Sequence, residues 1–147
     1  MYSLFVVNVS VVIFNDKNEI LLGLRSPKED VYPGLWGIPG GKIDSTDKSL
    51  EGGLAREVKE EVGIEIGDIN LISNNTRSAN GKNVLYLIFS TKIISGTPKA
   101  KEDTVDVKWF KFGEINPKEL TPFTFEVISK AVQKLSRHPL TTTNITF

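Results

Sequence analysis

The sequence contains no cysteine and only one histidine in its 147 residues. Without thiols the chain can form neither disulfide bridges nor thiolate metal sites, and this usage fits the reducing cytosol, so we expect a cytoplasmic protein. The single histidine, His138, stands near the C-terminus in the run Ser-Arg-His-Pro, where we expect a helix-end residue. Catalysis centred on histidine is therefore not expected.

Net charge is absent as well, because 18 basic side chains balance 18 acidic ones. No overall field would attract the protein to nucleic acid or anionic lipid, and no apolar stretch is long enough to span a membrane. The apolar start at residues 4–7 lacks the basic flank of a signal peptide and is interrupted by Asn8 and Ser10, so it predicts a buried strand. We expect neither nucleic acid nor a membrane as a partner.

Length and composition fit one domain with a single core, since 39% of the residues are hydrophobic and 24% are charged. We expect this domain to cover residues 1–138, followed by a flexible tail over 139–147. Periodicity and turn residues predict strands over 4–14, 19–24, 35–38, 69–73, 84–94 and 104–110, and helices over 49–62 and 121–137. One helix for each face of a mixed sheet predicts an α/β/α sandwich.

The first predicted helix carries three glutamates within five residues: Glu57, Glu60 and Glu61. At about 100° per residue they fall within roughly 100° of one another, and they overlap the edge of the apolar side. That apolar side consists of Leu50, Leu54, Ala55, Val58 and Val62. Such a placement is unusual for carboxylates and needs a physical reason.

Two readings of this acidic face are open. Two like charges 5 Å apart repel by about 0.8 kcal/mol in bulk water, but by about 3 kcal/mol at a partly buried edge. Three such groups would raise one another's pKa values or require a cation, and an all-oxygen ligand set favours Mg²⁺ or Mn²⁺. The alternative is a plain exposed helix face rich in Glu and Lys.

The residues around the helix favour the metal reading. The helix ends in Arg-Glu-Val-Lys-Glu-Glu-Val-Gly-Ile, from Arg56 to Ile64, and the loop before it carries the run Trp36-Gly37-Ile38-Pro39-Gly40-Gly41-Lys42. The segment from Gly41 to Ile64 resembles the signature of the Nudix hydrolase family, and its second half matches every fixed position. The MutT-like enzymes of this family cleave nucleoside diphosphates joined to another group X, and the resemblance implies the same α/β/α sandwich with a mixed central sheet.

The first half of the signature departs from the family. One extra residue lies between Gly41 and the helix, and Lys48 stands where the family has its first glutamate, which usually supports the arginine. Asp47 or Glu51 could substitute for that glutamate. Gly52 and Gly53 inside the helix each cost about 1 kcal/mol relative to alanine, and we expect close packing against the sheet as their reason.

The resemblance also implies roles for individual residues. Glu57, Glu60 and Glu61 would hold Mg²⁺ (or Mn²⁺), with the backbone carbonyl of Gly41 as a further ligand. Arg56 would form a salt bridge that fixes the acidic side chains, its alternative being an ordinary surface pair. Either Glu57 or Glu60 would orient or deprotonate the water that attacks phosphorus. The catalytic set is therefore Arg56, Glu57, Glu60 and Glu61.

Three residues outside the signature are further candidates. Relatives often add a carboxylate from the loop before the last strand, and Glu102 is preferred over Asp103 and Asp106 as that metal ligand. Arg25, at the end of the second strand, stands where relatives are often basic and could bind a substrate phosphate; an exposed cation is the alternative. Trp36 is expected to pack beside the loop instead of stacking on a base.

The sequence indicates only a broad class of substrate. No marker for a subfamily follows the signature, and the compact size favours a nucleoside or deoxynucleoside triphosphate, with a nucleotide sugar next. One alternative is a weakened Nudix domain that binds nucleotides for regulation. Another is a structural protein with an incidental acidic helix. The expected partner is a small nucleotide, and a homodimer stays open as the assembly.

Overall fold

The computed structural model describes residues 2–137, apart from the side chain of Ala79. The predicted helix end at His138 and the tail over 139–147 lie outside the described residues. The elements are β1 (Val6–Phe14), β2 (Ile20–Arg25), β3 (Trp36–Gly37), β4 (Gly40–Lys42), α1 (Leu50–Val62), β5 (Glu65–Ile66), β6 (Asn70–Ala79), β7 (Lys82–Ser95), β8 (Thr104–Phe110) and α2 (Thr124–Arg137), with short 3-10 turns at Phe112–Glu114 and Pro117–Glu119.

The strands form one mixed sheet around β1 and β2. Strand β1 runs parallel to β7, with Val6 opposite Val84 and Phe14 opposite Lys92, and antiparallel to β2 and β4. Strand β2 pairs with β3 and β8, and β7 also pairs with β5 and β6. Four successive residues of β1, Val11 to Phe14, are buried, as expected for a strand covered on both faces.

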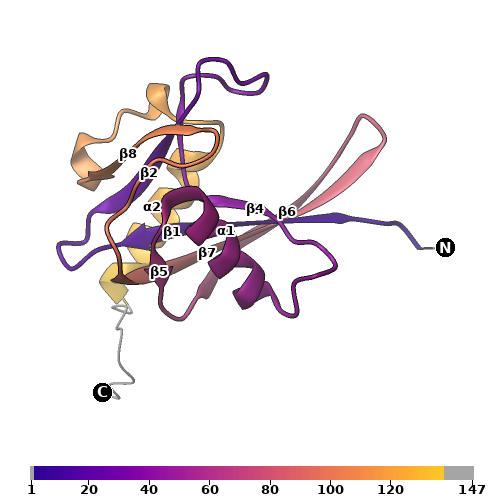
Figure 1. The fold of residues 1–147 in the computed structure, drawn as a ribbon, viewed down its shortest axis with the longest axis horizontal. Helices are drawn as coiled ribbons and strands as arrows, with labels where there is room; N and C mark the ends of the chain where they lie inside the picture. Colours follow the sequence, from indigo (N-terminus) through magenta and orange to yellow (C-terminus); the bar gives the residue numbers. More distant parts are fainter. Residues whose placement is uncertain (1, 138–147) are drawn as a thin grey trace.

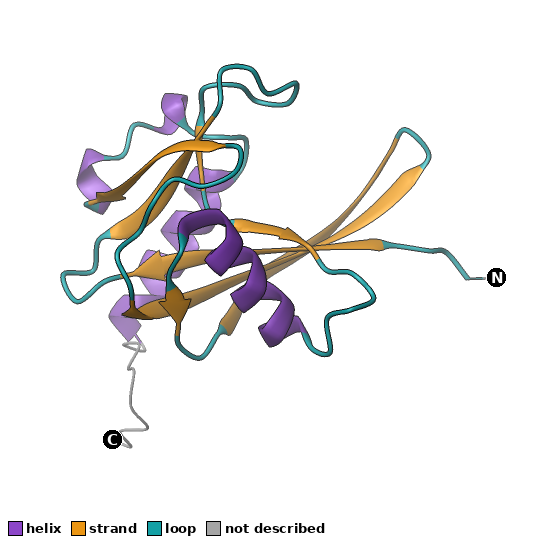
Figure 2. Ribbon diagram, in the orientation of Figure 1, coloured by secondary structure: helices purple, strands orange, loops and turns teal. Residues whose placement is uncertain are grey.

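One helix covers each face of this sheet (Figures 1 and 2). Helix α1 packs on alternate residues of β1, in a core of Val9, Val11, Ile13, Leu21, Leu54, Val58, Val62, Ile64 and Phe89. Helix α2 packs on the opposite face, in a core of Val12, Phe14, Ile20, Leu22, Ile115, Leu120, Ile128 and Ala131. The predicted α/β/α sandwich with a mixed central sheet is confirmed.

Helix α1 begins at Leu50, one residue after the predicted start, and ends at Val62 as predicted. The Ser49 side chain accepts a hydrogen bond from the Gly52 amide, and Gly63 closes the helix with a φ of 73°. The expectation that the helix glycines pack on the sheet is wrong. A Cβ at Gly53 would overlap Ile43 and press on the Asp47 carboxylate, so this glycine lets the loop before the helix lie against α1.

The predicted start of the second helix is also wrong, because α2 begins at Thr124 and not at Thr121. Phe123 has a φ of 65°, in the left-handed region, so the chain cannot be helical there. Instead the Phe123 carbonyl accepts a hydrogen bond from Val127, and Thr121 contacts Thr124 through their hydroxyl groups. Strands β4 and β5 were not predicted.

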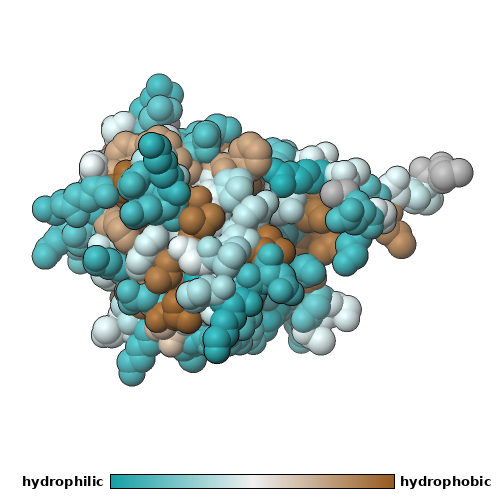
Figure 3. All heavy atoms as spheres, turned by 90° about the horizontal axis from the view of Figure 1, so that it is seen from above, coloured by the Kyte–Doolittle hydropathy of each residue, from teal (hydrophilic) through white to brown (hydrophobic). Residues whose placement is uncertain are grey.

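The surface carries apolar residues scattered among hydrophilic ones on the face shown in Figure 3. No helix within residues 2–137 is long and apolar enough to cross a membrane.

Candidate active site

Two glycines of β4 bring the acidic helix close to the sheet. Gly40 lies opposite Ser10 of β1, and a Cβ at Gly40 would overlap the Val9 carbonyl. A Cβ at Gly41 would overlap the carboxylate of Glu57. Gly40 therefore requires glycine, because the overlap is with backbone, whereas the space left at Gly41 is occupied by the end of the Glu57 side chain.

Arg56 holds the loop before α1 and part of the acidic face together. Its guanidinium donates two hydrogen bonds of 2.8 Å to the Asp47 carboxylate, whose side chain is only 5% exposed. It also forms ion pairs at 3.2 Å with Glu57 and Glu60. Asp47 thus takes the place of the missing first glutamate of the signature, one of the two substitutes expected from the sequence, while Glu51 is exposed.

In this network the single guanidinium of Arg56 is shared among several carboxylates. The hydrogen bonds from Arg56 lower the pKa of Asp47 to about 2. The same bonds raise the pKa of Arg56, and the neighbouring Glu57 adds to the effect. A planar guanidinium that forms two parallel bonds fixes orientation as well as charge, so Arg56 sets the direction of Glu57 and Glu60 along α1.

Glu57 and Glu61 lie in a different environment. Glu61 accepts a hydrogen bond of 3.1 Å from the Gly40 amide, yet its burial raises its pKa to about 7. Burial also raises the pKa of Glu57, which Arg56 only partly offsets. The Glu57 side chain is 18% exposed, whereas that of Glu60 is 46% exposed. Glu57 and Glu61 are therefore the two glutamates of α1 whose burial disfavours the charged form.

A polar pocket of about 280 Å³ opens over Glu57 and Glu61. Glu102 lines the same pocket and repels both glutamates, which raises their pKa values further. The remaining lining residues are Gly23, Arg25, Glu29, Gly37, Ile38, Gly40, Asp103, Thr104 and Thr121. Of the predicted site residues, the structure thus brings Glu57, Glu61, Glu102 and Arg25 together around one pocket.

Three other predicted site residues lie beside the pocket and do not line it. Glu60 pairs with Arg56 on the more exposed side of α1, and Gly41 lies under the Glu57 carboxylate. Arg56 itself is directed toward Asp47 and the loop. The roles given to these residues remain predictions.

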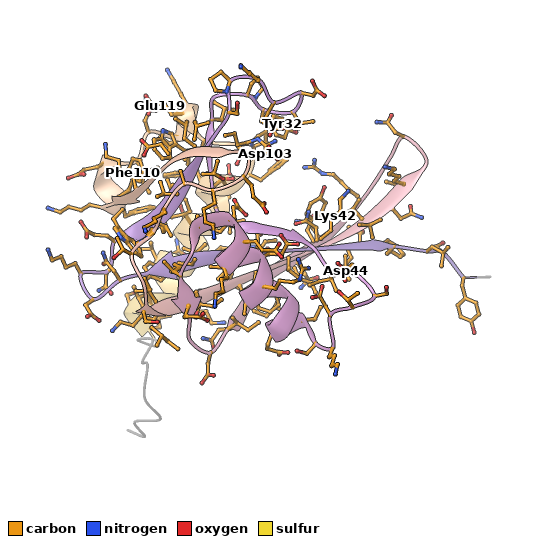
Figure 4. All side chains as sticks on the ribbon, in the orientation of Figure 1. Tyr32, Lys42, Asp44, Asp103, Phe110 and Glu119 are labelled. Carbon is orange, nitrogen blue, oxygen red and sulfur yellow. The ribbon has the colours of Figure 1, made fainter. Side chains whose placement is uncertain are left out.

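The two loops that rim the pocket contact each other. The Ser26 amide donates to the Asp103 carbonyl at 3.1 Å, which joins the loop after β2 to the loop before β8. In Figure 4 the labelled Tyr32 and Asp103 stand on these two loops, at the same end of the molecule. Arg25 donates to the Val31 carbonyl at 2.9 Å and pairs with Glu29 at 3.6 Å, so it is bound to its own loop.

The donor set fits a hard divalent cation. Glu57, Glu61 and Glu102 offer carboxylate oxygens, and their mutual repulsion at a partly buried pocket is what such a cation would offset. Among residues 2–137 no three acidic, histidine or cysteine side chains are already gathered to hold an ion. Glutamate side chains have enough rotamer freedom to converge, at an entropic cost.

Trp36 has the predicted packing role. Its ring contacts Phe110 edge-on, with the centroids 5.0 Å apart, at the border of the α2 core. The sequence prediction missed Gly40 as a donor to Glu61 and missed Glu29 beside Arg25. The run of glycines pointed to Gly40, but nothing in the sequence indicated which carboxylate its amide would meet.

Comparison with known proteins agrees with this geometry. The family model of the NUDIX domain matches residues 4–131. The 8-oxo-dGDP phosphatase NUDT18 of Danio rerio is 30% identical over 103 residues, which cover 69% of this chain and 31% of that protein. The chain thus spans about a third of that relative's length.

Solved structures show the same fold. The MutT Nudix hydrolase of Burkholderia pseudomallei has a TM-score of 0.73 and 28% identity, over 87% of this chain and 98% of that one. The Nudix domain of Shewanella oneidensis NrtR, solved with ADP ribose, has a TM-score of 0.78 and 23% identity, over 91% and 90%. With the family match, the Arg56–Ile64 motif and this fold together, the chain belongs to the Nudix hydrolase family.

Proposed function

We propose that the protein hydrolyses a diphosphate linkage in a nucleoside diphosphate joined to a group X, with a divalent metal ion as cofactor. The observation that carries this proposal is the pocket that gathers Glu57 and Glu61, two carboxylates whose pKa values are raised by burial, beside Arg25. A bound cation would offset the two carboxylates, and the cationic Arg25 side chain, which lines the same pocket, suits a phosphate group.

The metal site consists in this proposal of Glu57, Glu61 and Glu102, with Glu60 and the Gly41 carbonyl as further ligands. When bound, Mg²⁺ or Mn²⁺ would polarise the phosphoryl oxygens and neutralise the charge that develops on them. Arg56 would keep Glu57 and Glu60 in position through its bonds to Asp47. Arg25 would exchange its 3.6 Å pairing with Glu29 for a substrate phosphate.

The attacking water is assigned to Glu57 in preference to Glu60. Both glutamates pair with Arg56 at 3.2 Å, but only Glu57 lines the pocket. A carboxylate whose pKa is raised by burial is also a better proton acceptor near neutral pH than an exposed one. The water oxygen would form a bond to phosphorus, the anhydride bond would break, and the water proton would pass to Glu57.

The expected substrate is a nucleoside or deoxynucleoside triphosphate, followed by a nucleotide sugar. Two similar proteins widen the panel, because one is an 8-oxo-dGDP phosphatase and the other was solved with ADP ribose. The test measures phosphate and pyrophosphate release with Mg²⁺ from dNTPs, oxidised nucleotides, ADP-ribose, nucleotide sugars and dinucleoside polyphosphates. Saturable binding without product from any of them would favour the regulatory alternative.

A variant pair makes this test specific to the site. Glu57→Gln keeps the side-chain shape but removes the charge and the proton acceptor, so turnover should fall by at least 100-fold. Glu51→Gln, on the same helix but exposed and outside the pocket, should leave turnover within twofold. Equal activity of wild type and Glu57→Gln would refute the assignment of this pocket as the active site.

A further inference from the structure

One carboxylate of the pocket over Glu57 and Glu61 faces the cation that would bind phosphate. Glu29, on the loop after β2, lines this pocket and pairs with Arg25 at 3.6 Å. We infer that Glu29 is an internal competitor for phosphate, which occupies Arg25 in the free protein, lowers the affinity for phosphate ligands and takes Arg25 back when the product leaves. This inference rests on the proposed function, because it concerns the side chain that would bind the substrate phosphate.

Arg25 is the side chain of this pocket best suited to an anion. Among the described residues that line the pocket it is the only basic one, and it stands among five acidic residues: Glu29, Glu57, Glu61, Glu102 and Asp103. It also lines a neighbouring pocket of about 420 Å³, together with Tyr32 and Phe123, so it stands where two pockets meet. The Arg25 side chain is 38% exposed, so a dissolved anion can reach it.

The other bonds of Arg25 hold it in place without neutralising its charge. Its amide donates to the Leu35 carbonyl at 2.9 Å, its carbonyl accepts from the Gly34 amide at 3.2 Å, and its Nε donates to the Val31 carbonyl at 2.9 Å. These bonds close the loop after β2 at its base, and all of them involve uncharged backbone groups. Within residues 2–137, the ion pair of Arg25 is therefore the one with Glu29.

A turn in the main chain brings Glu29 to Arg25. The Ser26 carbonyl accepts from the Glu29 amide at 3.1 Å, and the Ser26 hydroxyl oxygen accepts from the Lys28 amide at 3.1 Å. The Ser26 amide is in turn bound to the Asp103 carbonyl at 3.1 Å. The loop thus keeps its shape through main-chain bonds and does not need the Glu29 carboxylate for it. What this carboxylate adds is a negative charge beside Arg25.

The contact between the two side chains is close enough to compete with a ligand and loose enough to be displaced by one. Arg25 Nη2 lies 3.6 Å from Glu29 Oε2, whereas charge-assisted hydrogen bonds of this kind are about 2.7–2.9 Å long. Both side chains are partly exposed, so water weakens their attraction. A phosphate carries more charge than a carboxylate and offers more acceptor oxygens, so it can take the guanidinium from Glu29.

Such competition acts on binding and on release, but not on the chemical step. Arg25 is competent for phosphate only in the fraction of molecules in which it has left Glu29, and the apparent affinity falls by that fraction. In the substrate complex the pair is already broken, so the barrier to hydrolysis is unchanged. After cleavage Glu29 can pair with Arg25 again. It therefore lowers the affinity for substrate and phosphate product alike.

The test measures binding apart from turnover. Imidodiphosphate, a diphosphate whose bridge resists hydrolysis, would be titrated into the protein with Mg²⁺ and followed by calorimetry. Glu29→Gln should bind it about fivefold more tightly than wild type, which is the effect expected for one partly exposed ion pair. Asp30→Asn is the matched control, because it removes the same charge at an exposed position outside the pocket, and it should leave the affinity unchanged.

A double-mutant cycle shows whether Glu29 acts through Arg25. Arg25→Gln should weaken the binding of imidodiphosphate about tenfold, and adding Glu29→Gln to it should restore none of this loss, because the cation for which Glu29 competes is gone. An equal gain from Glu29→Gln with and without Arg25 would indicate general repulsion and overturn the inference. Unchanged affinity in folded Glu29→Gln would overturn it too, as would the absence of binding to both proteins at millimolar concentration.

Steady-state kinetics give a second readout. For any nucleotide that is hydrolysed, Glu29→Gln should lower the KM and the inhibition constant of the phosphate product by the same factor of about five, without raising kcat. A merely structural role of Glu29 would instead raise the KM and lower the melting temperature. If imidodiphosphate binding depends on Glu29 and Arg25 as stated but no nucleotide is hydrolysed, the proposed function fails and this inference holds; turnover with a KM that is indifferent to Glu29 gives the opposite result.

Discussion

Helix α1 carries two groups of charges that differ in how they are satisfied. On one side Asp47, Arg56 and Glu60 form a paired network with bonds as short as 2.8 Å. On the other side Glu57 and Glu61 face Gly40 and Gly41, with Glu102 across the pocket. In the first group Arg56 lowers the pKa of Asp47, whereas in the second burial raises the pKa values of Glu57 and Glu61 although Arg56 also reaches Glu57. The difference separates residues that fix the helix from residues that await a ligand.

The burial of the Glu61 carboxylate has a free-energy cost. Burial raises the pKa of Glu61 from 4.5 to about 7, so keeping this carboxylate ionised in the fold costs on the order of 3 kcal/mol. The free energy of unfolding of a protein is typically about 5–15 kcal/mol, so this cost is a large fraction of it for one side chain. A charge held at this cost is consistent with selection for function over stability.

Among the substitutions that test the difference between the two groups, Glu61→Gln should have the largest effect. Removing the charge should lower Mg²⁺-dependent turnover by about 1,000-fold, because the buried ligand is lost. The same change should raise the melting temperature of the metal-free protein at pH 8, since the desolvated charge is gone. Glu60→Gln, on the paired side, should lose less activity and gain no stability. Loss of both activity and stability in Glu61→Gln would contradict this division of roles.

The pH dependence of stability tests the same group without a substitution. Because the pKa of Glu61 is higher in the folded state than its ordinary 4.5, its contribution favours folding most below about pH 4.5 and falls as pH rises to about 7. The metal-free protein should therefore lose up to about 3 kcal/mol between these values. Denaturation at pH 5 and 8 of wild type and Glu61→Gln would isolate this slope, which the variant should lack.

Gly41→Ala should affect the acidic group while sparing the core. The new Cβ would overlap the Glu57 carboxylate and displace it from β4, so we expect turnover to fall by about 10- to 100-fold. Gly113→Ala, where a Cβ meets nothing within 4 Å, is the matched control and should be neutral. A Gly41→Ala variant as active as wild type would show that the Glu57 position is not critical.

Asp47→Asn should have the smallest effect on chemistry, since it acts through Arg56. We expect about a tenfold loss of turnover with an unchanged set of substrates. Because the pKa of Asp47 is lowered to about 2, its ion pair stabilises the fold above about pH 4 and is lost as pH falls through about 2. The melting temperatures of variant and wild type should therefore differ at pH 7 and converge near pH 2.

The fold followed largely from the sequence because its elements are locally patterned. Alternating and continuous apolar runs marked β1, β2, β7 and β8, and Ser49 and Gly63 marked the ends of α1. Strand β4 was not predicted because Gly40-Gly41-Lys42 has no strand pattern and pairs with β1 only through tertiary contacts. The start of α2 was wrong because the left-handed Phe123 has no signal in the sequence.

The candidate site likewise has a part that could be predicted from the sequence and a part that could not. Spacing singled out the glutamates of α1, whereas the roles predicted for Arg56 and Glu102 came from the resemblance to the family. The hydrogen bonds from Arg56 to Asp47 depend on the path of the loop before α1. The extra residue changes this path, and Gly53 leaves room for the loop against the helix. Tyr32 and Phe123 line the neighbouring pocket from left-handed backbone positions, for which the sequence gives no signal.

The parallel pairing of β1 with β7 has a consequence for biogenesis. Val6 lies opposite Val84 and Ile20 lies opposite Phe110, so β1 and β2 acquire their long neighbours only after β7 and β8 have also been translated. Such distant contacts slow folding, and until they form the apolar residues of β1 stay open to wrong partners. Nascent chains truncated before residue 84 should therefore require chaperone protection.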